Sequence, residues 1–223
     1  MKLLIHFLIF FLNNLINTFI FIKTSQKNCN FGAINNAFIA PMAKKTLINE
    51  KEVHIILHRL ACQLIENHQD FSNTILIGIQ PRGVHLANRL VKILENEYHI
   101  KDIHLGKLDI TFYRDDFRRR DEPLEANKTD INFIVDAKKV VFIDDVLFSG
   151  RSIRAALTAI QTFGRPKNIE LLVLIDRRFS RHLPIQPDYK GRQVDVIKDE
   201  HVRVAWKENN EKDAVYIVNS GNK

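Results

Sequence analysis

Two adjacent carboxylates, Asp144 and Asp145, directly follow four apolar residues at 140–143. The apolar run predicts a buried parallel strand, and open α/β sheets bind their ligands at the carboxyl ends of such strands. A short loop with Ser149 and Ser152 follows and runs into an amphipathic helix, so hydroxyls and free amides are available to hold a phosphate. Carboxylates that can accept hydrogen bonds from sugar hydroxyls, beside a phosphate seat, indicate a site for a phosphorylated ribose.

Three other interpretations of the paired acids are open. The simplest is a strand that ends in solvated carboxylates. A phospho-receiver domain also has an acid pair, but usually on its first strand, whereas two predicted strands and a long charged loop precede Asp144. A P-loop NTPase has a Mg²⁺-binding acid at a strand end, yet the chain has no Gly-x-x-x-x-Gly-Lys-Ser/Thr sequence. The combination of acids, hydroxyl-bearing loop and helix therefore favours the ribose site.

Residues 140–152 resemble the phosphoribosyl-diphosphate (PRPP) signature of type I phosphoribosyltransferases. The resemblance implies that Asp144 and Asp145 are catalytic residues that hold the 2′- and 3′-hydroxyls of the ribose. It also implies that the loop wraps the 5′-phosphate, with two serine hydroxyls as donors and a glycine that lets the backbone approach closely. The expected PRPP-binding loop consists of Val146, Leu147, Phe148, Ser149, Gly150, Arg151 and Ser152.

The segment Gln80-Pro81-Arg82-Gly83 follows an earlier predicted strand. Alone it would be an ordinary strand-to-helix turn. Beside the PRPP signature it resembles the pyrophosphate loop of the same enzymes. The resemblance implies that Arg82 binds the diphosphate through charge-assisted hydrogen bonds and that Gly83 permits close approach of the backbone.

A charged segment from Arg114 to Lys128 has no apolar period and predicts a mobile loop. Its beginning resembles the flexible catalytic lid of these enzymes, which would close over the diphosphate and exclude water. Arg114 is the third candidate catalytic residue, because it could bond the leaving group. The lid residues are Tyr113, Arg114, Asp115 and Asp116.

A narrower family matches better than the superfamily. Residues 78–87, 108–116, 144–157 and 183–189 together resemble the PyrR family, whose members are pyrimidine operon attenuators with uracil phosphoribosyltransferase activity. The resemblance extends over about residues 44–218 and implies that uracil and PRPP give UMP and diphosphate, with Mg²⁺ bound through the substrate diphosphate. Asp176 and Arg177 would lie near the base or the diphosphate.

Regulation is the second implied activity, through binding of the chain to a pyrimidine operon leader mRNA in response to UMP or UTP. RNA contact requires a basic surface, and the alternative for each basic residue is a solvated face. The segments 177–182, 186–187 and 194–196 depart from the usual family pattern, which weakens the RNA prediction more than the catalytic one. The candidate RNA contacts are Arg59, Arg178, Arg181, Lys190 and Arg192.

Two alternatives to a protein with both catalytic and regulatory activity stay open. One is an RNA-binding attenuator with little catalysis, and the other is a phosphoribosyltransferase for a purine base. The family also suggests a homo-oligomer, a dimer or larger, with no membrane partner.

Helices and strands must alternate to bring these segments together, which predicts an α/β fold with a parallel sheet and right-handed crossovers. The expected architecture is the type I phosphoribosyltransferase fold, a mostly parallel central sheet flanked by helices, with a small hood and C-terminal antiparallel strands. Helices are expected from Asn49 to Ile65, from Val84 to Leu94 and from Ile153 to Ile160. Strands are expected at 74–79, 104–113, 140–143, 169–175, 202–206 and 214–218.

Composition sets the class and the compartment. The chain has 223 residues and a net charge of +7. Three lysines and no acid in residues 1–41 leave +4 on the rest, which suits phosphorylated ligands and permits RNA binding. Cys29 and Cys62 provide neither a disulfide framework nor a metal spacing, which favours the cytoplasm.

The N-terminal segment is treated separately. Residues 3–22 are apolar and about as long as a membrane span, but asparagines interrupt them. Met42 opens a sequence that resembles an ordinary protein start, so residues 1–41 are expected to be either an over-extended start or an apolar extension such as a membrane anchor. Residues 42–223 are expected to form the phosphoribosyltransferase domain.

Overall fold

The computed structural model describes residues 44–115, 126–179, 181–196 and 200–219. The chain divides between Ala40 and Pro41 into two units, and the first unit lies outside the described residues together with the predicted apolar extension. Among the described residues, no helix combines the length and the apolar character needed to cross a membrane. The predicted domain boundary at residue 42 stays a prediction.

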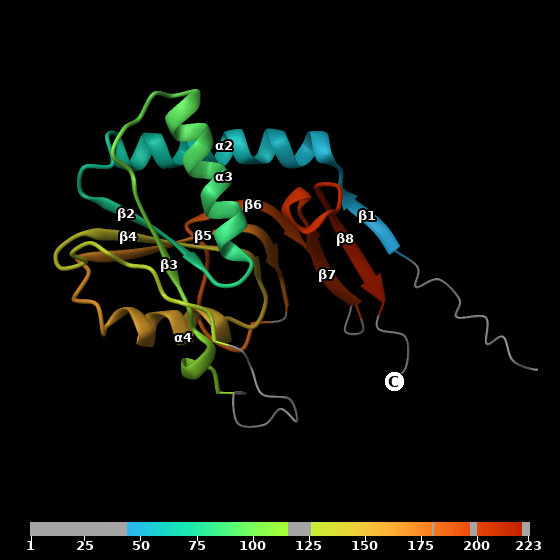
Figure 1. Ribbon diagram of the computed structural model, residues 1–223. Coiled ribbons are helices and arrows are strands. Elements are labelled where there is room, and N and C mark those ends of the chain that lie inside the picture. Colours follow the sequence, from blue (N-terminus) through green and yellow to red (C-terminus); the bar gives the residue numbers. More distant parts are fainter. Residues whose placement is uncertain (1–43, 116–125, 180, 197–199, 220–223) are drawn as a thin grey trace, which may run out of the picture. The chain divides into compact units, whose positions relative to one another are not determined.

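A five-stranded parallel sheet with strand order β3-β2-β4-β5-β6 forms the centre of the second unit (Figure 1). Its strands are β2 (Thr74–Ile79), β3 (His104–Leu108), β4 (Lys139–Leu147), β5 (Asn168–Arg177) and β6 (Tyr189–Val194). Every residue of β2 is buried, as expected for a parallel strand that is covered on both faces. The predicted α/β class is therefore confirmed.

Helices cover both faces of this sheet (Figure 1). They are α2 (Glu50–His68), α3 (Gly83–Asn96) and α4 (Arg151–Ile160), all three at predicted positions. Because side chains alternate along a strand, Val141 and Ile143 of β4 pack in the core with α2 and α3, whereas Val140 and Phe142 pack in the core with α4. The same alternation directs the two acids that follow toward opposite faces.

A separate antiparallel sheet has the order β1-β8-β7 and contains the C-terminal strands. It consists of β1 (Lys44–Ile48), β7 (Glu200–Ala205) and β8 (Ala214–Asn219), with the 3₁₀ turn η2 (Lys207–Asn209) between β7 and β8. Arg89 of α3 fixes this sheet to the rest, because its guanidinium bonds Asp213 at 2.7 and 2.8 Å and Glu208 at 2.6 and 2.9 Å. The same guanidinium lies 4.6 Å above the ring of Trp206.

The strand predicted at 104–113 is wrong beyond Leu108. The chain turns there into the 3₁₀ helix η1 (Thr111–Tyr113). The cause is local, because the Asp109 carboxylate accepts hydrogen bonds from the backbone nitrogen and the hydroxyl of Thr111, at 3.3 and 2.7 Å, and so closes a turn. Strands β1 and β6 were not predicted at all.

A buried polar network joins the C-terminus of α2 to three strands. His68 Nε2 lies 3.1 Å from the hydroxyl of Tyr189 and 3.2 Å from the carboxylate of Glu170, while Nδ1 lies 3.1 Å from the hydroxyl of Thr74. Tyr189 also donates to Glu170 at 2.7 Å. Burial lowers the pKa of His68, although the charge of Glu170 opposes that shift. The folded protein therefore favours the neutral imidazole.

Acidification should weaken the fold through His68. Below about pH 6.5 the unfolded chain takes up a proton that the folded imidazole resists, so stability falls as the pH falls toward the lowered pKa. His68→Gln should cost about 1–3 kcal/mol at neutral pH and remove this part of the pH dependence. Urea denaturation between about pH 7.5 and about pH 5.5 measures both effects. The exposed His104→Gln is the matched control, and an unchanged pH dependence in His68→Gln would contradict the assignment.

Candidate functional site

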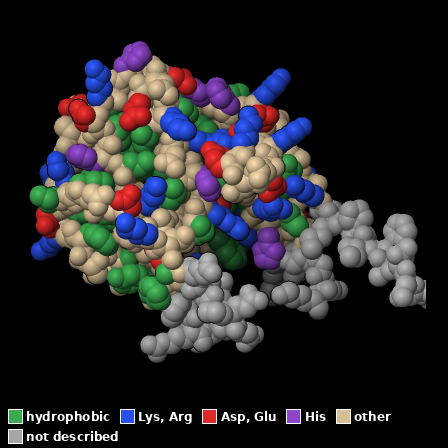
Figure 2. All heavy atoms as spheres, in the orientation of Figure 1, with side chains coloured by type: hydrophobic (Ala, Val, Ile, Leu, Met, Phe, Trp, Pro, Cys, Tyr) green, Lys and Arg blue, Asp and Glu red, His purple; other side chains and the backbone are tan. Residues whose placement is uncertain are grey.

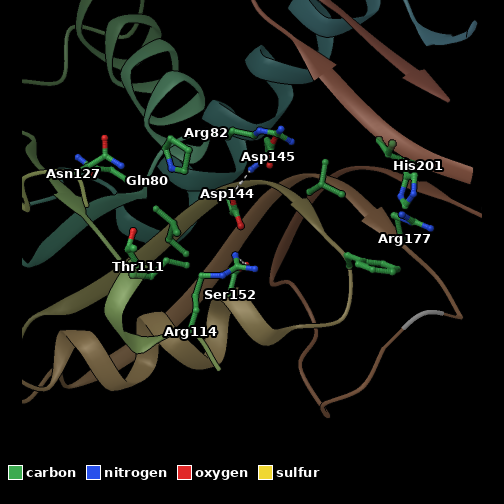
Figure 3. Close-up of a pocket in the computed structure, with 16 residues that line it drawn as sticks. Gln80, Arg82, Thr111, Arg114, Asn127, Asp144, Asp145, Ser152, Arg177 and His201 are labelled. Carbon is green, nitrogen blue, oxygen red and sulfur yellow. Dashed lines mark hydrogen bonds between the residues drawn. The ribbon is translucent and has the colours of Figure 1, made fainter. Parts of the chain in front are cut away.

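A cavity of about 500 Å³ opens at the carboxyl ends of β2 and β4 and reaches β5 and β7. Figure 3 shows Gln80 and Asn127 at one end, the two acids in the middle, and Arg177 and His201 at the other end. The cavity is lined by Ile79, Gln80, Pro81, Arg82, Ile110, Thr111, Arg114, Asn127, Asp144, Asp145, Val146, Phe148, Ser152, Arg177, His201 and Val202. Eight predicted site residues from four separate segments thus meet in one cavity, namely Arg82, Arg114, Asp144, Asp145, Val146, Phe148, Ser152 and Arg177.

Asp144 and Asp145 belong to the last part of β4 rather than to a loop, since β4 continues to Leu147. Both are almost completely buried, at 8% and 5% exposure. The backbone nitrogen of Asp145 donates to the Asp144 carboxylate at 2.9 Å. Burial, together with the like charge of Asp145, raises the pKa of Asp144 well above its usual value. Burial also raises the pKa of Asp145, and the positive charge of Arg82 opposes this shift.

Arg82 is the N-cap residue of α3, directly before Gly83. A cation at a helix N-terminus does not benefit from the helix dipole, which favours anions there, so its position points to an anionic ligand rather than to helix stability. Gly83 is needed for packing, because a Cβ at this position would lie 2.2 Å from the carbonyl oxygen of Ile143. The close approach that Gly83 permits is thus the contact of α3 with β4.

The predicted phosphate loop surrounds a second hollow of about 210 Å³ next to the main cavity. Gly150 has φ +89°, a conformation that favours glycine, and it is the N-cap residue of α4. The first turn of α4 therefore presents backbone N–H groups without intrahelical partners toward this hollow. Its lining contains the whole predicted loop, namely Val146, Leu147, Phe148, Ser149, Gly150, Arg151 and Ser152, together with Arg114, Asp144 and Ile153.

The base of the predicted lid contacts α4. Arg114 Nη1 donates to the hydroxyl of Ser152 at 3.4 Å, which places the guanidinium in both hollows. Asp115 pairs with Arg151 at 3.1 Å and with Arg154 at 2.8 Å. Hydrogen bonding to Arg151 lowers the pKa of Asp115. Tyr113 ends η1 and does not line either hollow, and Asp116 lies outside the described residues.

The structure separates Asp176 and Arg177, which were predicted as a pair. Arg177 lines the main cavity, and its guanidinium lies 4.1 Å above the ring of Phe148. Asp176 does not line the cavity, because its buried carboxylate bonds Arg181 and accepts from Gln193 at 3.3 Å. Arg181 in turn donates to the carbonyl oxygen of Phe148 at 2.6 Å.

Sequence reasoning assigned no role to several residues that line the cavity. Gln80 and Thr111 lie inside segments that the family resemblance used, so their positions could have been inferred from it. Asn127 and His201 lie in segments without a recognisable pattern, and Val202 begins a predicted strand to which no site role was assigned. These five residues are Gln80, Thr111, Asn127, His201 and Val202.

Among the described residues, no three acid, histidine or cysteine side chains are grouped so that they could hold a metal ion. The two acids that line the cavity are adjacent and buried. A divalent cation at this site would consequently need oxygen ligands from a bound anion, which fits a metal that enters with a diphosphate.

The basic residues that were predicted to contact RNA divide into two groups. Arg59 of α2, Lys190 and Arg192 of β6 lie together, because Arg59 donates to the carbonyl oxygen of Lys190 at 3.3 Å and Arg192 lies 3.7 Å from Glu52 of α2. In the view of Figure 2, Lys and Arg side chains are interspersed with acids and histidines. The first group is thus a cluster of three basic residues on the α2–β6 face.

The other two RNA candidates are engaged in ion pairs elsewhere. Arg178 bonds Asp195 with its Nε at 2.6 Å, and Arg181 bonds Asp176 beneath the main cavity. Because Arg181 pairs with a buried carboxylate and Arg178 forms a two-bond ion pair, the α2–β6 cluster is the stronger candidate for a contact with RNA.

The phosphoribosyl transferase domain model matches residues 45–209. A protein from Desulfosudis oleivorans, named bifunctional protein PyrR, is 42% identical over 177 residues, which cover 79% of this chain and 97% of the relative. A protein of the same name from Enterococcus faecalis OG1RF is 37% identical over 181 residues, covering 81% of this chain and 99% of the relative. A third, from Picosynechococcus, is 41% identical over 172 residues, covering 77% and 96%.

Solved structures agree on the fold. A hypoxanthine phosphoribosyltransferase from Staphylococcus aureus superimposes with a TM-score of 0.61 at 18% identity, covering 83% of this chain and 96% of that one. The hypoxanthine phosphoribosyltransferase of Trypanosoma cruzi gives 0.60 at 14% identity, with coverage of 78% and 96%. At these identities the likeness establishes the fold alone, and it confirms the predicted type I phosphoribosyltransferase architecture.

Asp144→Asn should stabilise the folded protein, by about 1 kcal/mol at about pH 8. Because the pKa of Asp144 is raised in the folded state, the protein loses stability as the pH rises through that pKa and the carboxyl group ionises. The asparagine of the variant does not ionise, so the variant does not lose this stability. The advantage should shrink as the pH falls from about 8 through the raised pKa of Asp144, because Asp144 then becomes protonated in the folded state. Thermal melts across this range measure it.

Asp176→Asn is the matched control, since Asp176 is equally buried but bonds Arg181. This variant should be destabilised. If the two variants shift the melting temperature in the same direction, the electrostatic description of the acid pair is wrong.

Proposed function

Since the chain belongs to the PyrR family of phosphoribosyltransferases, we propose that it transfers the phosphoribosyl group of PRPP to uracil, giving UMP and diphosphate. The observation that carries this proposal is the meeting of Arg82, Arg114 and the Asp144–Asp145 pair around one cavity beside a helix N-terminus. The cavity and the hollow next to it together contain acceptors for sugar hydroxyls and donors for two phosphate groups. PRPP requires this combination.

The ribose half of the reaction rests on β4 and α4. Asp144 and Asp145 accept hydrogen bonds from the 2′- and 3′-hydroxyls, and the loop Val146–Ser152 with the first turn of α4 binds the 5′-phosphate. As the bond to the diphosphate breaks, positive charge develops on the sugar ring. The negative charge of the acid pair stabilises it, and a buried site strengthens that interaction.

The leaving group is held from two sides. Arg82 approaches from the N-terminus of α3, and Arg114 approaches from the segment that follows η1. Both guanidiniums donate charge-assisted hydrogen bonds to the departing diphosphate oxygens. Closure of the segment that Arg114 begins would exclude water, which would otherwise capture the activated sugar.

Mg²⁺ is the cofactor that this proposal includes. Bound to the diphosphate, it supplies positive charge that stabilises the leaving group. The raised pKa of Asp144 fits a site where a nearby cation would favour the ionised acid pair. The ion would be held through the oxygens of the substrate diphosphate, with the acid pair close by.

Regulation of a pyrimidine operon through its leader mRNA is the second part of the proposal, with UMP or UTP in the same cavity as the signal. The α2–β6 cluster supports it, since phosphate contacts from Arg and Lys dominate RNA affinity. A homo-oligomer and a cytoplasmic location, both predicted from the sequence, remain parts of the proposal.

Asp145→Asn should lower kcat/KM for UMP formation by about 100-fold or more. Two charged hydrogen bonds to the ribose weaken, and each is worth about 1.5–3 kcal/mol. An assay of UMP from uracil and PRPP with Mg²⁺ measures the loss, with the exposed Glu66→Gln as control. Hypoxanthine and guanine in the same assay test a purine base. Full activity in Asp145→Asn would refute the site, and a preference for a purine would refute the uracil assignment.

RNA binding should tighten with UMP and weaken steeply with salt. Lys190→Ala should reduce the slope of log K against log salt by about 0.7–0.9, the value for one phosphate contact. Lys190 is the clean variant, because its side chain is exposed whereas the Arg59 guanidinium also bonds the backbone. Exposed Lys101→Ala is the control. Filter binding to the operon leader at several salt concentrations measures the slope. An RNA affinity that does not change when UMP is added would contradict the regulatory proposal.

A further inference from the structure

Five buried polar side-chain atoms among the described residues lack a hydrogen-bond partner, and three of them belong to residues that line the main cavity. These three are the acceptors Gln80 Oε1 and Asp145 Oδ2 and the donor Arg177 Nε. An unpaired buried polar atom costs about 1–3 kcal/mol, so a group of them around one cavity indicates atoms that a ligand supplies.

The three atoms divide the cavity into chemically different regions. Asp145 lies in the middle, where the ribose hydroxyls of the proposed substrate are donors that satisfy its free oxygen (Figure 3). Arg177 lies at the end formed by β5 and β7, away from Gln80 and Asn127 (Figure 3). The atom missing there must be an acceptor, because a guanidinium only donates.

Arg177 is held in place from two directions. Its Nη2 donates to the carbonyl oxygen of Glu200 on β7 at 3.1 Å, and its guanidinium carbon lies 4.1 Å above the ring of Phe148. The residue is only 5% exposed, so its rotamers are restricted. The Glu200 carbonyl oxygen fixes one terminal nitrogen of the guanidinium, and the Phe148 ring fixes its face. The Nε–H therefore remains as an unpaired donor with a defined direction.

Phe148 is a large apolar residue of the phosphate loop, and 42% of its surface is exposed. Its backbone is fixed by the 2.6 Å hydrogen bond from Arg181, which also bonds the buried Asp176. The ring therefore lies beneath Arg177 on a supported loop, at the border between the main cavity and the phosphate hollow.

We infer that Phe148 is a positioning residue that holds Arg177, and that Arg177 Nε donates to a ring carbonyl oxygen of the base. This inference rests on the proposed transfer to uracil. The carbonyl of the inference is the one at C4, because both bases have an oxygen at C2. Uracil has a carbonyl oxygen at C4 where cytosine has an amino group, and that amino group would set donor against donor at Arg177. The Phe148–Arg177 pair thus selects a keto pyrimidine over an amino pyrimidine.

Steady-state kinetics of Phe148→Leu test the positioning role. The leucine keeps apolar bulk but removes the π face, and a cation–π contact of about 1–2 kcal/mol corresponds to a rise of about 5- to 30-fold in KM for uracil. KM for PRPP should change less than KM for uracil, because the loop binds phosphate through backbone amides and serine hydroxyls, whereas the Phe148 ring contacts Arg177. Phe148→Tyr should restore the uracil KM. Phe163→Leu is the matched control, an aromatic residue of 38% exposure that does not line the cavity.

Binding of UMP and CMP provides a second measurement that does not depend on turnover. Calorimetry should show UMP affinity falling in Phe148→Leu and in Arg177→Lys, which keeps the charge but loses the planar guanidinium. CMP affinity should stay the same, so that the preference for UMP narrows. If Phe148→Leu does not fold, judged by its circular dichroism melt, Arg177→Lys carries the test.

Three results would overturn the inference. These are an unchanged uracil KM in Phe148→Leu, an equal rise for uracil and PRPP, and a Phe148→Tyr variant that fails to rescue. An unmodified chain that makes no UMP from uracil would instead refute the proposed function, because the variants are compared with that activity.

Discussion

The burial of two adjacent carboxylates at the end of β4 determines what the residues around them must do. Asp144 and Asp145 lose most of their hydration, and Asp144 also experiences the charge of Asp145. Positive charge has to lie close by, and Arg82 at the start of α3 provides it. Arg82 can reach that point only because Gly83 has no side chain, so that α3 packs directly against the backbone of β4. The packing of one helix on one strand thus brings the cation and the acids together.

Much of this arrangement could be predicted from the sequence because its determinants are local. The run 140–143 reads as a buried strand, the cap at Asn49 starts a helix, and the acids directly follow the strand. β6 could not be predicted in this way. It carries the charged residues Lys190 and Arg192, its burial alternates irregularly, and its place beside β5 depends on Gly191, where a Cβ would lie 2.4 Å from the Leu174 carbonyl oxygen. That is a tertiary constraint without a sequence period.

The same difference between local and tertiary determinants explains which site residues were found. Asp144, Asp145, Arg82 and Arg114 lie in segments whose residue types suffice to suggest phosphate or ribose binding. His201 and Asn127 enter the cavity only because β7 and the segment after residue 125 fold next to it. Asp176 shows the opposite error, since adjacency to Arg177 suggested a shared role. Successive residues of a strand point to opposite faces, so the carboxylate of Asp176 points away from the cavity and bonds Arg181.

The two ends of the cavity consequently differ in how much of the structure a substitution would disturb. The ribose end is built from consecutive residues of β4, its loop and the first turn of α4, so a substitution there disturbs the strand, the loop and the helix cap together. The far end combines Arg177 and Glu200 with the ring of Phe148, whose backbone belongs to the phosphate loop, and Arg89 anchors β7 and β8 independently through Asp213 and Glu208. A change of base preference could therefore arise at Arg177 and β7, with the PRPP-binding half left intact. This separation suits a fold in which one sugar-phosphate site serves many different bases.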